Sequence, residues 1–177
     1  RLSKSLKGFA RKPGQNLTTV DLAALFDELS MLVSAEARRC NAELILDPGD
    51  PPVQVLAGPV RLSQVLVNLV SNGLQAVSGR PLRQVRLAAR QEGALVVITV
   101  SDTGPGIDEE ARESLFEPFF TTKPKGEGLG MGLSIAYTIV QDFGGSMQGE
   151  NRPEGGAVFT VTLPTAREEG KQMDAAS

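Results

Sequence analysis

Residues 59–77 read PVRLSQVLVNLVSNGLQAV. Pro59 suits the first turn of a helix, and the apolar residues after it recur at helical spacing. This pattern predicts an amphipathic helix from Pro59 to about Val77, whose apolar side can cover a sheet. That side carries Leu62, Val65, Leu66, Leu69, Gly73, Ala76 and Val77. A second helical stripe is polar and contains Arg61, Gln64, Asn68, Asn72 and Gln75.

Segments of strand and helix character lie on both sides of this helix. Upstream, Asp21 is placed to cap a helix that reaches about Arg39, with an apolar stripe of Leu22, Leu25, Phe26, Leu29, Leu32 and Val33. Short apolar runs predict strands at 18–20, 43–46, 53–56, 84–90, 95–101, 146–150 and 157–163. Two further helices are expected at 109–115 and 130–143, and residues 153–156 are expected to close a hairpin.

The order of these elements predicts the fold class. Strands and helices are mixed, and at least two pairs of consecutive strands are expected to form hairpins, which favours an antiparallel or mixed sheet. We therefore expect an α+β fold. It would be a two-layer sandwich with a mixed, mostly antiparallel sheet of about five strands, covered on one face by about three helices.

Composition limits the class of protein. The 177 residues are 41% hydrophobic and 22% charged, as in an ordinary globular domain. The net charge of −3 argues against a broad basic surface, so we expect no nucleic-acid partner. One cysteine, Cys40, excludes an internal disulfide framework and fits a reducing compartment. No apolar run approaches the roughly 20 residues of a membrane helix.

The two ends of the chain differ from its centre. Residues 1–14 place apolar side chains at helical spacing and stop at a Pro-Gly pair, as at the end of a longer helix. Residues 15–164 form the expected domain. Residues 165–177 are polar and are expected to be a disordered tail.

The polar stripe of the 59–77 helix contains a pair of amides with the right spacing to act together. Asn68 and Asn72 are four residues apart, so their side chains lie one turn above each other. Two such amides can offer oxygen atoms to Mg²⁺, which keeps several waters and substrate phosphates as its other ligands. A simple solvated polar face remains the alternative for this helix taken alone.

A glycine-rich turn follows the strand predicted at 95–101. The sequence there is SDTGPG, and Asp102 stands at the end of the strand, where its carboxylate can accept a hydrogen bond from an adenine amino group. Gly104 and Gly106 permit a tight turn and the close approach of a ligand to the backbone. An ordinary Asp-Gly turn is the alternative.

Two further segments have the composition of a lid over a phosphate. The first, LFEPFFTTKPKGEG, places Phe116, Phe119 and Phe120 just before Lys123 and Lys125. Aromatic anchors at a hinge followed by a cation that meets phosphate would explain this order, and plain core packing of the aromatics is the alternative.

The second segment has glycines at 126, 128, 130 and 132 and leads directly into an apolar helix, whose N-terminal N–H groups can bind an anion. A flexible linker is the alternative. Two other phosphate sites are excluded, because neither GxGxxG after a βαβ start nor GxxxxGK[ST] occurs.

In chain order, NLVSN, DTGPGI, FEPFFTTK and GEGLGMGL resemble the asparagine, first glycine, phenylalanine and second glycine boxes of histidine-kinase catalytic domains. These domains belong to the superfamily that also holds DNA gyrase, MutL and the large heat-shock chaperones. The resemblance runs from residue 17 to residue 163, and it implies a Bergerat-type sandwich with an ATP lid. The stretch from Phe116 to Gly145 is most similar to nitrogen-regulatory sensor kinases, especially the sensors of four-carbon dicarboxylate uptake.

The resemblance implies roles for particular residues. Asn72 would ligate Mg²⁺ with Asn68 beside the phosphates, Asp102 would bind the adenine amino group, and Gly106 would make room for the base. Lys123 would reach a terminal phosphate. The full set implied to bind ATP is Asn68, Asn72, Gln75, Asp102, Gly104, Gly106, Ile107, Thr122, Lys123, Gly128, Leu129, Gly130, Met131 and Gly132.

The sequence departs from the family pattern at three positions. Gly73 stands where alanine is usual, which should weaken the helix slightly. Gly58 replaces an aspartate that could cap the helix. Gln75 is neutral where some relatives carry a phosphate-binding lysine.

The resemblance also implies partners and a reaction. The parent kinase would be a membrane-anchored homodimer with this part on the cytoplasmic side of the inner membrane, passing phosphate to a response regulator of the sigma-54 activator type. The γ-phosphoryl group of ATP would go to a histidine on the kinase's own dimerisation domain. Because this chain contains no histidine, we expect ATP binding without self-phosphorylation.

Two other functions remain open. An ATP hydrolase such as gyrase or MutL generally has a glutamate one turn before the magnesium-binding asparagine, and here that position is Asn68. A docking module without nucleotide is the second alternative, against which Asn72, Asp102 and the glycine loop all argue. The related anti-sigma serine kinases lack a segment like FEPFFTTK.

Overall fold

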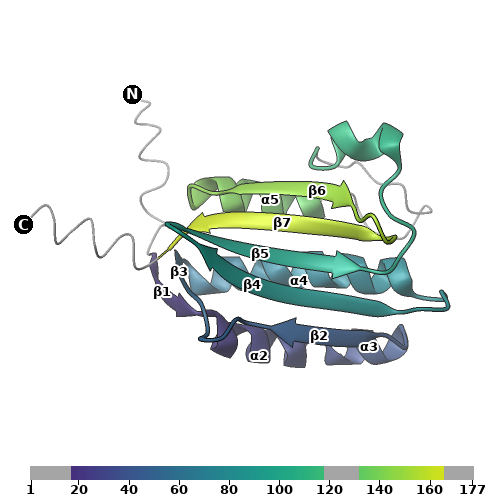
Figure 1. The fold of residues 1–177 in the computed structure, drawn as a ribbon, viewed down its shortest axis with the longest axis horizontal. Coiled ribbons are helices and arrows are strands. Elements are labelled where there is room, and N and C mark those ends of the chain that lie inside the picture. Colours follow the sequence, from purple (N-terminus) through teal and green to yellow (C-terminus); the bar gives the residue numbers. More distant parts are fainter. Residues whose placement is uncertain (1–16, 118–131, 166–177) are drawn as a thin grey trace, which may run out of the picture.

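Strands and helices alternate along the part of the chain that the computed structural model describes, residues 17–117 and 132–165 (Figure 1). In chain order the strands are β1 (Thr18–Asp21), β2 (Glu43–Asp47), β3 (Gln54–Ala57), β4 (Gln84–Glu92), β5 (Leu95–Asp102), β6 (Ser146–Asn151) and β7 (Ala157–Pro164). The helices are α2 (Leu22–Leu32), α3 (Ser34–Arg39), α4 (Pro59–Val77), the 3₁₀ helix η1 (Glu109–Ser114) and α5 (Gly132–Asp142). No helix in these two ranges is long and apolar enough to cross a membrane.

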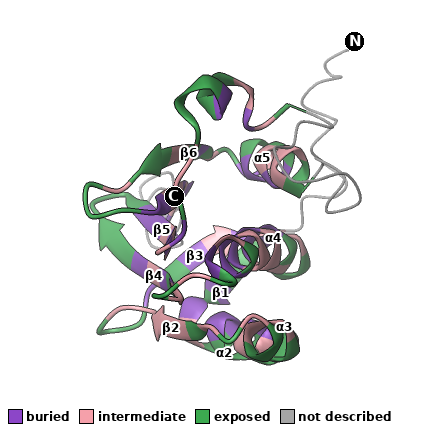
Figure 2. Ribbon diagram, turned by 90° about the vertical axis from the view of Figure 1, so that its right-hand side faces the viewer, coloured by how far each residue is buried: buried purple, intermediate pink, exposed green. Residues whose placement is uncertain are grey.

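The main sheet has five strands in the order β2-β4-β5-β7-β6. β2 pairs with β4 in parallel, and the other three pairs are antiparallel. β1 and β3 form a separate antiparallel pair. Helices α2, α3, α4 and α5 lie on one face of the large sheet (Figure 2). The predicted two-layer α+β fold with a mixed, mostly antiparallel sheet is therefore confirmed.

Helix α4 lies at the centre of the helical layer and has the bounds that its sequence pattern predicts. Its apolar side is buried against the sheet, and Leu62, Leu66 and Leu69 are at most 1% exposed. Ala76 at the edge of this side is half-buried. At the first turn of α4, Arg61 forms an ion pair of 3.1 Å with Asp142 at the end of α5. This ion pair joins the start of α4 to the end of α5.

The helix expected from Asp21 to about Arg39 is two helices. Its N-terminus is as predicted, because the Ala23 N–H donates to Asp21 Oδ1 at 3.0 Å. The chain leaves helical geometry at Val33 and restarts as α3. The prediction that Leu32 belongs to the buried stripe is wrong, since its side chain is 66% exposed. Leu32 is the last residue of α2 and falls at the edge of the apolar stripe, where the sheet is out of reach.

The described residues run one residue beyond the expected boundary at 164. Thr165 is 1% exposed, pairs with Val55 in a β-bridge and donates its N–H to the Ala94 carbonyl at 3.1 Å. Thr165 therefore packs against the described strands, and the domain boundaries at 15 and 164 stay a prediction. The terminal segment 1–14 and the rest of the expected tail, 166–177, lie outside the described residues.

Candidate functional site

Two of the four predicted sequence segments meet at the start of α5. Asn68, half-buried on α4, donates its Nδ2 hydrogen to the carbonyl of Gly132 at 3.2 Å. Gly132 is the first residue of α5, and a Cβ built on it would lie 4.0 Å from the Asn68 amide. This contact brings the amide stripe of α4 to the helix that the glycine string precedes.

Asn72 lies one turn further along α4 and is half-buried. Within residues 17–117 and 132–165, its amide makes no hydrogen bond to another group. An amide oxygen in this position fits the chemistry of a Mg²⁺ ligand, because the ion prefers oxygen donors and takes the rest of its shell from water and phosphate. The same ranges contain no group of three or more His, Cys, Asp or Glu residues that could form a carboxylate-rich metal site.

The Gln75 side chain is directed to α3. Its Nε2 donates to Glu36 Oε2 at 3.2 Å and to Ser71 Oγ at 3.3 Å. Ser71 in turn donates to Glu36 Oε1 at 2.7 Å. In this structure Gln75 thus takes part in a polar contact between α3 and α4. Its place in the polar stripe does not indicate Glu36 as a partner.

Asp102 ends β5 as predicted, and its side chain is buried, with 4% of the residue exposed. Its Oδ1 accepts hydrogen bonds from the N–H of Gly104 at 2.8 Å and, more weakly, from the N–H of Ala157 at 3.4 Å. Within the described residues no hydrogen bond reaches its second oxygen, Oδ2. A buried carboxylate with one oxygen held and the other available is suited to accept a hydrogen bond from a ligand.

The surroundings of Asp102 have opposing effects on the pKa of its carboxyl group. Burial raises the pKa of its carboxyl above the ordinary value of 3.8, because a charge loses its hydration there. The N–H groups of Gly104 and Ala157 and the positive charges of Arg152 and Arg80 act in the opposite direction, and the net shift remains upward. Holding this carboxylate ionised in the interior therefore costs free energy that a hydrogen-bond donor on a ligand would offset.

The turn after Asp102 requires glycine at two positions. A Cβ on Gly104 would lie 2.9 Å from both the Cβ and the carbonyl oxygen of Ala76 on α4. Gly106 has φ +91°, and a Cβ on it would lie 2.8 Å from Asn151 Oδ1. Both glycines thus admit close packing of the turn against protein groups, which is a different reason from the room for a base that the resemblance implies for Gly106.

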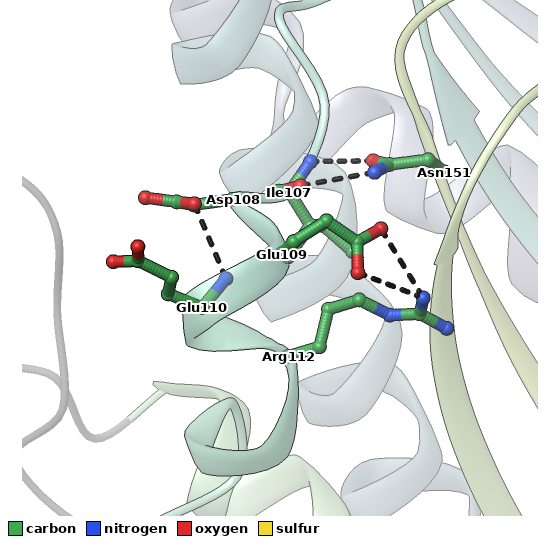
Figure 3. Close-up of polar contacts among 6 residues, drawn as sticks. All are labelled: Ile107, Asp108, Glu109, Glu110, Arg112 and Asn151. Atoms are coloured by element: carbon green, nitrogen blue, oxygen red, sulfur yellow. Dashed lines mark hydrogen bonds and ion pairs between the residues drawn. The ribbon is translucent and has the colours of Figure 1, made fainter.

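The hairpin between β6 and β7 packs on this turn, and its side chains did not stand out in the sequence. Figure 3 shows the Asn151 amide paired with the backbone of Ile107: the Ile107 N–H donates to Oδ1 at 2.6 Å, and Nδ2 donates to the Ile107 carbonyl at 3.0 Å. Arg152 donates to the carbonyl of Asp102 at 2.8 Å. The predicted hairpin at 153–156 was the available signal, but nothing in the sequence indicates which turn it would contact.

Thr103 is a further residue of the site that sequence reasoning missed. Its hydroxyl donates to the Leu82 carbonyl at 2.8 Å and accepts from the Gln84 N–H at 3.0 Å. These two bonds fasten the residue after Asp102 to the start of β4. Thr103 therefore holds the first part of the turn, and Asn151 holds the last part.

Phe116 packs as an anchor at the start of the expected lid. Its ring stacks on Tyr137 of α5, with centroids 5.0 Å apart, and meets Phe159 of β7 edge-on at 6.5 Å. The remaining predicted lid and phosphate residues lie outside the described ranges: Phe119, Phe120, Thr122, Lys123, Lys125, Gly126, Gly128, Leu129, Gly130 and Met131. On one side the structure therefore joins Asn68 to Gly132, with Asn72 one turn further along α4. The other side holds Asp102, Gly104, Gly106 and Ile107.

Comparison with known proteins gives a family match over more than half of the chain. Residues 57–167 match the family of histidine kinase-, DNA gyrase B- and HSP90-like ATPases. The chain is 38% identical over 159 residues to the C4-dicarboxylate transport sensor protein DctB of Pseudomonas aeruginosa, covering 89% of this chain and 26% of DctB. It is 38% identical over 169 residues to the sensor protein DctS of Rhodobacter capsulatus, covering 93% and 25%. The chain thus spans about a quarter of the length of these curated relatives.

Solved structures to which the chain is similar include histidine kinases. The nucleotide-free catalytic domain of histidine kinase ThkA superposes with a TM-score of 0.75 at 33% identity, over 85% of this chain and 96% of that domain. Full-length ShkA in complex with AMPPNP gives 0.72 at 30% identity, over 85% and 31%. ThkA in complex with the response regulator protein TrrA gives 0.73 at 28% identity, over 94% and 47%.

These matches cover the two sides of the site described above, the amide stripe of α4 and the Asp102 turn. The chain belongs to the histidine kinase-, DNA gyrase B- and HSP90-like ATPase family, among the catalytic domains of sensor histidine kinases.

Proposed function

We propose that this chain binds Mg-ATP between α4, the end of β5 and the start of α5, and presents its γ-phosphoryl group to a histidine of another domain. The observation that carries the proposal is Asp102. A buried carboxylate whose pKa is raised by burial, and whose Oδ2 receives no hydrogen bond from the described residues, is stabilised by the amino group of adenine. The bound AMPPNP named for ShkA supports a nucleotide in this fold.

The residues of this chain would act by positioning and by charge. Asp102 would select the base, and the turn at Gly104 and Gly106 would form the wall beside it. Asn72 would hold Mg²⁺, with Asn68 next to the phosphates, and the ion would neutralise phosphate charge during transfer. Lys123 and the N–H groups of Gly128, Gly130 and Gly132 would bind the phosphates, together with Thr122, Leu129 and Met131 around them. Gln75 belongs to the set only if nucleotide binding releases it from Glu36.

Phosphoryl transfer would then need an acceptor from outside this chain, which has no histidine. The acceptor would be the kinase's own dimerisation domain, with residues 1–14 as the end of its helix hairpin. The phosphate would pass on to a response regulator, which we propose is of the sigma-54 activator type. The complex named for ThkA and TrrA supports a response regulator as the partner. The parent protein would be an inner-membrane sensor of four-carbon dicarboxylates with this domain in the cytoplasm.

ATP hydrolysis is the second candidate activity, and Asn68 argues against it. An amide cannot accept a proton from water, and the Asn68 Nδ2 is bonded to the Gly132 carbonyl at 3.2 Å. The hydrolase reading would be favoured if multiple-turnover ATPase activity survived Asn68→Ala and were abolished by Asn72→Ala.

Titration calorimetry with ATP, with and without Mg²⁺, tests the proposal. We expect saturable binding that Mg²⁺ strengthens and that Asp102→Asn weakens by roughly 10- to 100-fold, since a hydrogen bond to a charged group contributes about 1.5–3 kcal/mol. No binding by the wild-type chain under either condition would contradict the proposal. The proposal also predicts that no stable phosphohistidine forms on this chain alone.

A further inference from the structure

The β6–β7 hairpin contacts the turn after Asp102, residues 103–107, and the end of β5 at several points. Asn151 is the last residue of β6, and its side-chain amide pairs with both backbone groups of Ile107, at 2.6 and 3.0 Å (Figure 3). Ile107 itself is 44 residues earlier in the chain. A side-chain amide that engages an N–H and a C=O of the same residue imitates a strand pairing and fixes that residue in position as well as in orientation.

Other residues of the hairpin contact the end of β5. Arg152 donates to the Asp102 carbonyl at 2.8 Å, and its own N–H closes the hairpin by donating to the Gly156 carbonyl at 2.8 Å. Gly156 has φ +89°, and a Cβ on it would lie 1.9 Å from the Asp102 carbonyl oxygen. The backbone of the hairpin is therefore in direct contact with the residue that we propose binds the base.

Few other hydrogen bonds hold the turn between Gly104 and Asp108. Thr103 is held by β4, the Gly104 N–H is held by Asp102, and the Asp108 side chain caps η1 through the Glu110 N–H at 3.2 Å. Among the described residues, the hydrogen bonds to backbone groups of 105–107 come from Asn151 alone. Without that amide, the chain between Gly104 and Asp108 would have to be ordered by the ligand.

We propose that Asn151 is a positioning residue of the base subsite: it holds residues 104–107 in the place that adenine requires, and so sets both ATP affinity and the preference for adenine over guanine. This inference rests on the proposed function. A preordered turn removes an ordering cost from binding, which is how a residue remote from the ligand raises affinity. It acts on the base and not on the phosphates, because the turn lies at Asp102 and away from the Asn68–Gly132 contact.

The experiment measures the binding of ATP and of GTP to the 177-residue chain by competition against a fluorescent ATP analogue in Mg²⁺ buffer. Guanine carries an oxygen where adenine carries the amino group, so in the same orientation that position offers Asp102 no donor, and GTP should depend less on the turn. Loss of the two Asn151 bonds in Asn151→Ala should weaken ATP binding about tenfold, the size of about 1.4 kcal/mol. GTP binding should change by less than about twofold, so that the ATP-to-GTP ratio falls.

Two matched controls lie beside Asn151. Arg112→Ala breaks the exposed pair with Glu109 on η1, drawn in the same view, and Gln148→Ala removes an exposed side chain from the same strand. Both should leave the ratio unchanged. Asn151→Asp keeps an oxygen for the Ile107 N–H but loses the donor to its carbonyl, and we expect an intermediate ratio. It also serves as the test if Asn151→Ala does not fold, which thermal melting reports.

The outcomes separate the two proposals. If the wild-type chain binds neither nucleotide, the proposed function fails and this inference fails with it. If the wild type binds ATP and Asn151→Ala matches the Arg112→Ala control, the inference alone is overturned. It is also overturned if Asn151→Ala weakens ATP and GTP equally, since that result describes a general loosening of the domain.

Discussion

The two sides of the candidate site are built in different ways. The Asp102 side consists of residues 102–107 and the hairpin residues 151–157, and it is joined by backbone contacts and by the side chains of Asn151 and Arg152. The α4–α5 side consists of Asn68, Asn72 and Gly132, and a hydrogen bond of 3.2 Å from Asn68 to the Gly132 carbonyl joins its two helices. The Asp102 side is joined by many contacts between strand ends and turns, whereas the α4–α5 side is formed by the surfaces of two helices. Substitutions at the tightly packed backbone positions of the Asp102 side should therefore destabilise the fold, whereas substitutions on the α4–α5 side should weaken binding alone.

Gly156→Ala should have the largest effect on stability. Its Cβ would overlap the Asp102 carbonyl oxygen at 1.9 Å, and its φ of +89° disfavours any side chain. We expect the free energy of unfolding to fall by about 2–4 kcal/mol, measured by urea denaturation. Gly155→Ala is the matched control, because Gly155 has φ +108° but nothing within 4 Å. It should cost only the backbone strain, about 1 kcal/mol. Equal losses for the two variants would show that the contact with Asp102 does not matter.

Asn72→Ala should do the reverse, with a large effect on binding and a small one on stability. The amide has no hydrogen-bond partner in the described residues, so removing it leaves no buried group unsatisfied. We expect ATP affinity in Mg²⁺ to fall about tenfold or more and the strengthening by Mg²⁺ to disappear, measured by calorimetry. Gln64→Ala, an exposed change on the same helix, should have neither effect. A fall of the same size without Mg²⁺ would contradict the assigned role.

Asp102→Asn should weaken ATP binding while stabilising the fold at neutral pH. The folded-state pKa of Asp102 is raised above 3.8, so the folded protein binds its proton more tightly than the unfolded chain does. Ionising this carboxyl therefore lowers the free energy of unfolding. This cost is absent below pH 3.8, appears as the pH rises through that value, and is complete above the folded-state pKa. Asparagine keeps an oxygen for the Gly104 N–H and carries no charge.

Denaturant unfolding of Asp102→Asn and the wild type across acidic and neutral pH measures this difference. The two should be closest below pH 3.8, and the advantage of the variant should grow toward neutral pH. A wild type that gains stability relative to the variant as the pH rises would show that the hydrogen bonds and arginine charges outweigh burial.

Most of the fold and half of the site follow from local sequence patterns. The bounds of α4 and the position of Asp102 at the end of β5 were predictable, because helical periodicity and a strand that ends in a turn residue are signals within a few residues. The contact of Asn151 with Ile107 was not, because it depends on the register of β6 on β7 and on how far the hairpin reaches. Gln75 pairs with Glu36 only because α3 restarts after Val33. Contacts across the sheet or between helices carry no short-range signal.

Gly73→Ala should have the smallest effect, and it tests how closely α4 approaches the Asp102 side. Alanine is favoured over glycine in a helix by about 1 kcal/mol. At this position a Cβ would lie 3.3 Å from both methyl groups of the fully buried Val85 and 3.5 Å from the Asp102 Cβ. The gain and the crowding should nearly cancel, leaving the free energy of unfolding within about 0.5 kcal/mol of the wild type.

A double-mutant cycle with Val85→Ala separates the two contributions to Gly73→Ala. Once the Val85 methyl groups are absent, the same change should stabilise the protein by the full helix preference of about 1 kcal/mol, measured by urea denaturation. If Gly73→Ala already gives that stabilisation in the wild-type background, the Val85 side chain can move aside without a free-energy cost. Crowding by Val85 would then not be the reason for a glycine at position 73. If it stabilises in neither background, the limiting contact is with Asp102, and the two sides of the site are coupled through α4.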